Sequence, residues 1–155
     1  MHSRIYQVSS EPITEENLIE ECRYDEWDHA DYVNKQVSST NIESDLEWLQ
    51  TANNGIKVNV EEKTITITSK EEYFTKSHDE FKELVEELST ITLKDFSNGK
   101  ANIKFYDLKC AFEDKYGFYI DDNYEYCGLS SLDNWVRNAE ENKPYHIGSI
   151  FDYHF

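Results

Sequence analysis

Apolar and polar residues alternate with a period of two in three parts of the chain, a pattern typical of strands with one buried face. The first part lies at residues 4–8. The second covers 56–67, where two alternating runs joined by the polar link 61–63 predict an antiparallel hairpin. The third is the terminal run 145–155, and a shorter segment at 118–120 is also compatible with an extended conformation. The pattern therefore predicts four or five strands.

Apolar residues at helical spacing predict five or six helices between these strands. Thr40 with Glu43, and Ser69 with Glu72, match the capping-box pattern of a helix start, and Asn98 with Gly99 indicates a turn. The segment 91–96 before that turn fits either a loop or a short strand. The expected helices begin near Thr14 and Thr40, extend from Ser69 past Leu88, and span 28–36, 103–116 and 131–139.

These elements predict an α+β fold, with a mostly antiparallel sheet of about four to five strands packed against about five to six helices. A chain of 155 residues is expected to form a single globular domain over 1–155. Eight Phe, eleven Tyr and three Trp supply the bulky side chains that disordered chains lack. With five Gly and two Pro, the sequence has no extended flexible linker.

The charge balance changes the functional picture more than any motif does. The chain has 32 Asp and Glu against 15 Lys and Arg, a net charge of -17, and the first 50 residues alone carry a net charge of -9. A field of this sign repels nucleic acid and anionic lipid and attracts cationic surfaces. We therefore expect neither direct nucleic-acid binding nor membrane binding, and the sequence favours a basic protein as partner.

The acid-rich N-terminal third contains the candidate partner-binding residues. If 14–22 form a helix, Glu16 and Glu20 lie in one row on its surface, which gives an array of carboxylates with coarse phosphate-like spacing. Aromatic side chains between the acids are candidate anchors, although they are equally compatible with a place in the core. The predicted contacts are Glu15, Glu16, Glu20, Glu21, Asp25, Glu26, Asp28 and Asp31, with Tyr24 and Trp27 as anchors.

No arrangement of residues indicates catalysis or a cofactor. Asp121 and Asp122 are adjacent acids, but a turn explains them equally well, and no nucleophile elbow, phosphate-binding loop or dinucleotide fingerprint occurs. His29 and His78 each have acidic neighbours but lack a third ligand at a recognisable spacing. No metal ion and no cofactor are therefore predicted, and the protein is not expected to be an enzyme.

Three cysteines without a CxxC pair argue against both a disulfide framework and a zinc ribbon, and each is expected in a packed or aromatic environment. The N-terminus lacks an apolar run long enough for a signal peptide, and no stretch approaches the ~20 apolar residues of a membrane-spanning helix. These features favour a cytoplasmic protein.

The leading hypothesis is an acidic inhibitor or decoy that blocks the nucleic-acid-binding surface of a basic protein. Small DNA-mimicking antirestriction and anti-CRISPR proteins of mobile elements act in this way, and the analogy is one of physical class. Three alternatives remain open. They are an immunity or antitoxin partner of a basic nuclease, an accessory structural domain whose charge maintains solubility, and a metal-dependent enzyme with carboxylates around His29 or His78.

Overall fold

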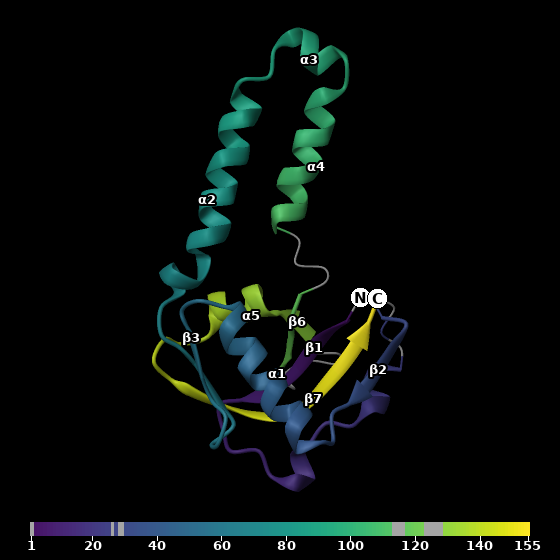
Figure 1. Cartoon of the computed structure of the whole chain (residues 1–155), viewed down its shortest axis with the longest axis vertical. Helices are drawn as coiled ribbons and strands as arrows, with labels where there is room; N and C mark the ends of the chain where they lie inside the picture. Colours follow the sequence, from purple (N-terminus) through teal and green to yellow (C-terminus); the bar gives the residue numbers. More distant parts are fainter. Residues whose placement is uncertain (1, 26, 28–29, 113–116, 123–128) are drawn as a thin grey trace.

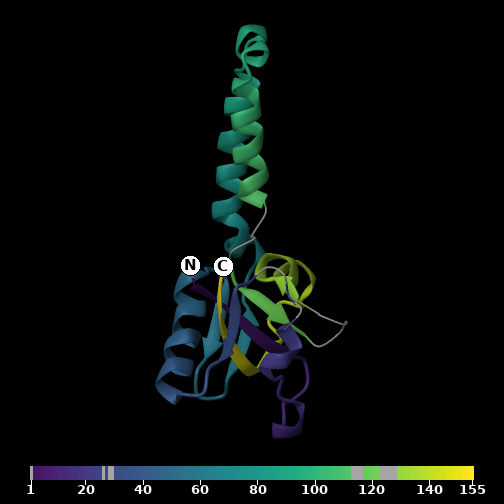
Figure 2. The same ribbon diagram turned by 90° about the vertical axis from the view of Figure 1, so that its right-hand side faces the viewer.

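The computed structural model describes residues 2–25, 27, 30–112, 117–122 and 129–155, and it has two visibly different parts (Figure 1). A sheet with helices against it forms what we call the body, which contains the described residues outside 70–112. Residues 70–112 form a helical hairpin that projects away from the body in both views (Figures 1 and 2). The fold is therefore α+β, as the sequence predicts.

The body is organised around a seven-stranded mixed sheet with the order β3-β4-β7-β1-β5-β6, in which β2 also pairs with β7. β1 and β5 are parallel, whereas the other pairs are antiparallel. The sheet is thus larger than the predicted four to five strands and is not purely antiparallel. The strands are β1 (His2–Ser9), β2 (Tyr32–Lys35), β3 (Ile56–Asn59), β4 (Thr64–Ile67), β5 (Tyr119–Asp121), β6 (Leu129–Ser131) and β7 (Pro144–His154).

β7 holds the sheet together because it is the longest strand and has neighbours along both edges. It pairs with β1 over most of its length, with β4 near its start and with β2 near its end. The predicted hairpin of 56–67 is confirmed as β3 and β4, and the predicted strand at 145–155 is confirmed as β7. The missed strand β6 has only three residues, too few for a period of two to be visible.

Each face of the sheet has its own apolar cluster, because alternate residues of a strand point to opposite faces. On the first face, Tyr6 and Val8 of β1 pack with Leu46 and Leu49 of α1 (Ser39–Ala52) and with residues of α5 (Leu132–Asn138). On the second face, Ile5 packs with Phe151 and Tyr153 of β7 and with Ile19 and Tyr24 of the N-terminal segment. An irregular segment therefore covers one side of the sheet, where we expected helices.

The hairpin consists of two antiparallel helices and a short helix at its tip. α2 (Lys70–Ser89) begins at Ser69, whose side chain accepts a hydrogen bond from the Glu72 backbone as the predicted capping box requires. α3 (Leu93–Ser97) begins with a complete capping box between Thr92 and Asp95, and α4 (Lys100–Phe112) returns toward the body. A turn at Gly99, with a φ of 78°, connects α3 to α4.

Several predicted elements are wrong near the N-terminus. The helix expected from Thr14 is replaced by two 3-10 helices, η1 (Glu15–Asn17) and η2 (Glu21–Tyr24). The helix expected over 28–36 is replaced, in its described part, by β2, because Val33 packs on the second face of the sheet.

α1 is confirmed, but its N-cap is Ser38, so the capping box at Thr40 is wrong. The ambiguous segment 91–96 contains most of α3.

None of the helices in the described part of the chain is long and apolar enough to cross a membrane.

Candidate protein-interaction surface

The candidate site lies on residues 10–31, which we call the acidic segment. Its part around η1 (Glu15–Asn17) forms the end of the body that lies opposite the hairpin (Figures 1 and 2). Gln7, a buried residue of β1, connects it to the sheet: its side-chain nitrogen donates to the Asn17 carbonyl at 2.6 Å, and its oxygen accepts from the backbone nitrogens of Ile19 and Ser149. These bonds hold a segment without regular structure in one place, because each satisfies a backbone group that burial would otherwise leave unpaired.

A second attachment lies around Asp121, which is fully buried in β5. Arg23 donates to this carboxylate through two guanidinium nitrogens, at 2.5 and 3.1 Å, and the Tyr24 hydroxyl donates to it at 3.0 Å. Burial, followed by the adjacent Asp121 carboxylate, raises the pKa of the Tyr24 hydroxyl well above its usual range, so this hydroxyl stays a donor. Asp121 therefore belongs to a buried structural cluster and not to the turn that we predicted.

The two aromatic residues predicted as partner anchors point into the body. Tyr24 is only 5% exposed and packs edge-on against Phe151. Trp27 is half-buried, and its ring packs edge-on against Tyr119 and Tyr153 at 5.2 Å between centroids. Both side chains are already used in the second core cluster, so of the two interpretations that the sequence left open, the structure shows the core.

The carboxylates of the acidic segment fall into two groups. Glu20 forms an ion pair with Lys35 at 2.7 Å, Glu21 accepts from the Lys35 backbone at 2.5 Å, and Asp31 lies 3.1 Å from the His154 ring. Three others, Glu15, Glu16 and Asp25, are exposed and form no side-chain ion pair with any described residue, and neither does the adjacent Glu11. Glu26 and Asp28 lie outside the described residues.

The basic residues closest to this segment in the sequence are bound to acids of the protein itself. Arg23 is bound to Asp121. Arg4 pairs with Asp152 and lies 2.8 Å from Asp45, another buried acid. Burial raises the pKa of the Asp45 carboxyl above its ordinary value, although Arg4 opposes the shift. The two arginines are therefore paired with carboxylates of the sheet and of α1, and Lys35 is paired with the exposed Glu20.

The expected array of carboxylates in a helical row is wrong. The row at Glu16 and Glu20 required an α-helix through residues 14–22, and the structure has an extended connection between η1 and η2 there, with Glu20 at φ -106° and ψ 160°. The distances between the carboxylates along the segment therefore depend on two short 3-10 helices, and not on the regular repeat of an α-helix. What remains of the prediction is a locally dense group of exposed acids on one well-anchored segment.

The described residues offer no centre for metal binding. No three His, Cys, Asp or Glu side chains within the described ranges are close enough together to hold a metal ion. His78 is exposed, and its Nδ1 lies 3.7 Å from an Asp79 carboxylate oxygen. His29 lies outside the described residues. Cys22 is exposed, contrary to the packed environment expected for it. Within the described ranges, no cluster of ligands therefore favours the alternative of a metal-dependent enzyme, and the surroundings of His29 lie outside them.

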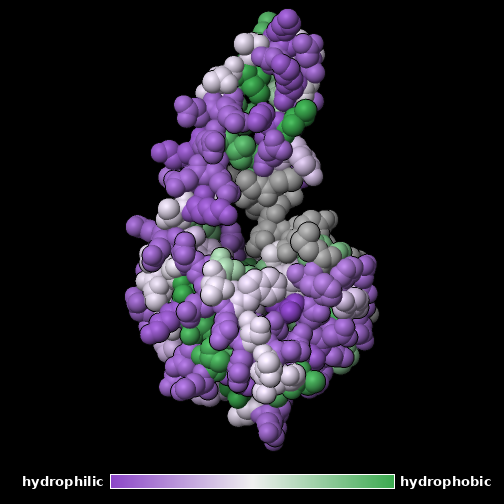
Figure 3. All heavy atoms as spheres, viewed as in Figure 1, coloured by the Kyte–Doolittle hydropathy of each residue, from purple (hydrophilic) through white to green (hydrophobic). Residues whose placement is uncertain are grey.

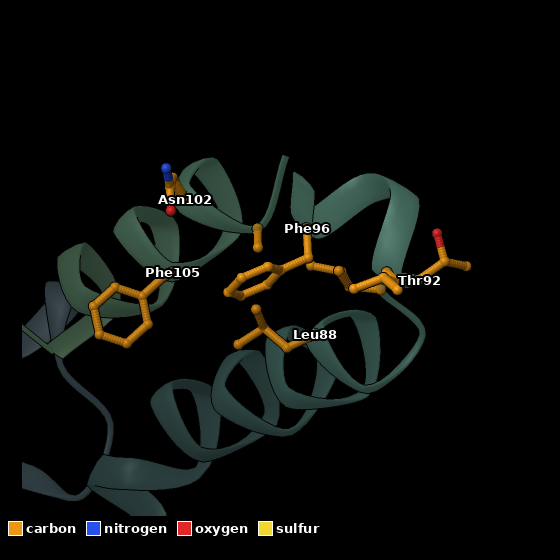
Figure 4. Close-up of a pocket in the computed structure, with 8 residues that line it drawn as sticks. Leu88, Thr92, Phe96, Asn102 and Phe105 are labelled. Carbon is orange, nitrogen blue, oxygen red and sulfur yellow. The ribbon is translucent and has the colours of Figure 1, made fainter. Parts of the chain in front are cut away.

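Sequence reasoning gave no weight to the hairpin as a site, yet several of its apolar side chains are exposed, and Figure 3 shows hydrophobic spots among its hydrophilic residues. A groove of about 490 Å³ at its tip is lined by Leu88 of α2, Phe96 of α3 and Phe105 of α4. Figure 4 shows the Leu88 and Phe96 side chains pointing toward one another, with Phe105 beside them. Leu88 and Phe105 belong to the apolar stripes that predicted these two helices, and a stripe of this kind reads in the sequence like one that is buried.

Comparison with known proteins gives no assignment for this chain. No protein-family model matches it, and neither the curated proteins nor the solved structures contain a significant match. The function must therefore be inferred from its own residues.

Proposed function

We propose that this protein is a non-enzymatic binding protein whose acidic segment captures a basic, nucleic-acid-binding protein and blocks its nucleic-acid surface. The contacts would come from Glu11, Glu15, Glu16 and Asp25, with Glu20, Glu21 and Asp31 at the margin of the interface. Tyr24 and Trp27 contribute indirectly, since they hold the segment on the sheet.

One observation carries the proposal: the acidic segment is firmly attached to the sheet, while Glu11, Glu15, Glu16 and Asp25 are exposed and form no ion pair with any described residue. Gln7, Arg23 and Tyr24 fix the backbone, so a partner would meet a segment that is already ordered. Self-repulsion among such acids costs stability. A partner with Lys or Arg side chains would remove that cost.

Electrostatic attraction of this kind favours fast association and has a characteristic salt dependence. Exposed charges attract over about one Debye length, which is ~10 Å at 0.1 M salt and ~3 Å at 1 M. Proteins that bind nucleic acid cluster Lys and Arg side chains on one face, where they neutralise phosphates. An acidic segment at one end of the molecule would therefore compete with nucleic acid for the same cations, and its affinity would fall steeply with added salt.

The test is capture of proteins from a cell lysate on the immobilised protein, at low and at high salt. We expect a basic nucleic-acid-binding protein to be retained at low salt only. A triple variant, Glu15→Gln, Glu16→Gln and Asp25→Asn, should retain about tenfold less of it, because each exposed ion pair contributes up to ~1 kcal/mol. The captured protein, once purified, should lose its bound DNA or RNA when this protein is added.

A matched control removes three negative charges elsewhere. Glu61→Gln, Glu62→Gln and Glu86→Gln change exposed acids in the β3–β4 turn and on α2. If both triple variants weaken capture equally, only the net charge matters and the acidic segment has no specific role. Capture that persists at high salt would contradict the electrostatic mechanism. A nuclease as the captured protein would favour the immunity or antitoxin alternative on the same surface.

A further inference from the structure

The hairpin meets the body at a groove of about 600 Å³, which lies between the N-terminal part of α2 and the end of α5. α5 lies beside the start of α2 in both views (Figures 1 and 2). Pockets of this size hold small molecules when they are mostly apolar and contain a few polar groups that fix orientation. The lining residues on α2 lie three or four positions from one another and therefore share one face of the helix. They are Lys70, Phe74, Ser77, His78 and Phe81, and α5 contributes Arg137.

This groove is basic in a strongly acidic protein. None of its lining residues is Asp or Glu, although the chain has 32 of them. Of the three arginines, Arg4 and Arg23 are paired with buried acids. The Arg137 side chain forms no ion pair and no hydrogen bond with any described residue. An arginine that the protein's own excess of acids does not neutralise is available to an anion from outside.

The Arg137 guanidinium is held against Phe74. Its central carbon lies 4.3 Å from the centroid of the Phe74 ring, close enough for a cation–π contact. This contact engages the charge and leaves the N–H groups without an acceptor among the described residues. A guanidinium presents its N–H groups as a planar fork that matches the two oxygens of a carboxylate. The geometry therefore favours a carboxylate beside the Phe74 ring.

Lys70 adds a second cation to the groove. Its ammonium group donates to the Arg137 carbonyl at 2.9 Å, which leaves its other N–H groups for a further acceptor. The neighbouring acid Glu141 accepts from the Lys70 backbone nitrogen, at 2.6 Å, and forms no ion pair with the ammonium group. An anion bound to Arg137 can therefore also be bound by Lys70.

The two walls of the groove are in place before any ligand binds. The hydrogen bond from Lys70 joins α2 to the end of α5. The Tyr73 hydroxyl joins the same two helices, because it donates to Asp133 at 2.7 Å. A site whose walls are already fixed loses less conformational entropy on binding.

We propose that this groove binds a small aromatic carboxylate. The carboxylate accepts hydrogen bonds from Arg137 and Lys70, and the aromatic ring packs against Phe74, which is half-buried, and Phe81, which is 37% exposed. Burial of the apolar surfaces supplies affinity, and the two cations select a negative charge.

This groove and the acidic segment lie in different parts of the molecule. The groove is at the base of the hairpin, whereas η1 of the acidic segment lies at the opposite end of the body (Figure 1). A protein partner and a small carboxylate can therefore bind independently of each other.

The first experiment titrates the full chain with naphthoate and follows the backbone amide chemical shifts by NMR. We expect shifts in the N-terminal part of α2 and at the end of α5, with a dissociation constant of about 1 mM or lower, as for small ligands in open grooves. Naphthamide has the same ring without the charge and should bind at least about tenfold more weakly, because it cannot pair with the two cations. This comparison uses the unmodified protein and does not depend on the folding of a variant.

Substitutions test the two cations separately. Arg137→Gln and Lys70→Gln should each weaken naphthoate binding at least about tenfold, as expected for loss of a hydrogen bond to a charged group. Lys143→Gln is the matched control and should bind naphthoate like the unmodified protein. Lys143 also lies over an aromatic ring, that of Tyr145 at 5.5 Å, but it has an acid partner in Glu140 at 3.6 Å. Far-UV circular dichroism would show that each variant is folded.

Three results would contradict the proposal. Absence of shifts at the groove up to about 10 mM naphthoate overturns it entirely. Equal affinities for naphthoate and naphthamide, or an equal loss of affinity in Lys143→Gln and Arg137→Gln, overturn the role of the two cations. A naphthyl phosphate that binds at least about tenfold more tightly than naphthoate overturns the choice of a carboxylate and assigns the groove to phosphate monoesters.

Discussion

The body and the hairpin use similar apolar residues with opposite results. In the body, Ile5, Phe151 and Ile120 are completely buried, because both faces of the sheet are covered. In the hairpin, Phe96 and Phe105 are more than half exposed, because the described helices α2, α3 and α4 cover one another on one side only. An apolar residue at regular spacing thus indicates a surface that can be buried, and the number of layers around it decides whether it is buried.

Charge shows the same contrast. The body binds Arg4 and Arg23 to the buried acids Asp45 and Asp121, whereas Glu11, Glu15, Glu16 and Asp25 are exposed and form no ion pair with any described residue. In the hairpin, Lys100 and Lys104 are paired with acids of the hairpin itself, and acids and lysines nearly balance. The two regions therefore differ in the surface that they expose: carboxylates on the acidic segment, and apolar rings such as Phe96 and Phe105 on the hairpin.

The largest expected difference concerns truncation of an apolar side chain in each part. Phe151→Ala removes a fully buried ring of the second core cluster and should lower the free energy of unfolding by about 3 to 5 kcal/mol. Phe105→Ala should change the unfolding of the body by less than ~0.5 kcal/mol, since its ring is mostly in solvent. Urea unfolding followed by tryptophan fluorescence measures this directly, because Trp27, Trp48 and Trp135 all lie in the body. Equal losses for both variants would contradict the separation into two regions.

A smaller effect is expected at the hairpin tip. Thr92→Ala removes the capping box of α3 and should destabilise the hairpin by about 1 kcal/mol. Hydrogen exchange should report faster exchange in α3 and in the adjacent ends of α2 and α4, while the tryptophan unfolding curve stays unchanged. Ser131→Ala is a matched control, because Ser131 is the N-cap of α5 in the body and its removal should shift the tryptophan curve. A shift of that curve by Thr92→Ala would show that hairpin and body unfold together.

The smallest effects are two opposite pH dependences. Burial raises the pKa of Asp45 above 3.8, so its stabilising contribution is complete below pH 3.8 and is lost as the pH rises through the raised value. Hydrogen bonds from Thr92, followed by that from Lys100, lower the pKa of Asp95 to about 2, so its contribution is present above pH 3.8 and is lost as the pH falls toward about 2.

Two variants separate these contributions. The free energy of unfolding of Asp45→Asn should rise relative to that of the unmodified protein as the pH increases from 3 to 7, because the buried Asp45 carboxyl loses its proton in the unmodified protein only. Unfolding followed by tryptophan fluorescence measures this difference. Asp95→Asn should weaken the hairpin in hydrogen exchange above pH 4, and the difference from the unmodified protein should shrink as the pH falls toward the pKa of Asp95, which is about 2. The same sign for both variants would contradict the opposite environments of the two acids.

Prediction of the fold succeeded where the local pattern and the tertiary environment agree. The alternation in 56–67 and the capping residue Ser69 correspond to β3, β4 and the start of α2. It failed at Leu18, Ile19 and Cys22, whose spacing fits a helix, because Ile19 is buried on the sheet while Leu18 and Cys22 are exposed. Backbone hydrogen bonds to Gln7 replace those of the expected helix.

Prediction of the candidate site was limited in the same way. The exposed state of Glu15, Glu16 and Asp25 agrees with the general tendency of acids to lie in solvent. The roles of Tyr24 and Arg23 depend on Asp121, which is almost 100 residues away in the sequence and is adjacent only because β5 pairs with β1. No local pattern contains that information.

The sequence alone determined the α+β class, the excess of negative charge and the positions of most helices and strands, because these depend on composition and on periodicity over a few residues. The tertiary structure alone decided which apolar faces are covered, which acids are neutralised and which remain exposed. Burial and ion pairing depend on contacts between residues distant in the chain, such as Gln7 with Asn17 and Ser149. The projecting hairpin and the anchored acidic segment are therefore properties of the folded protein.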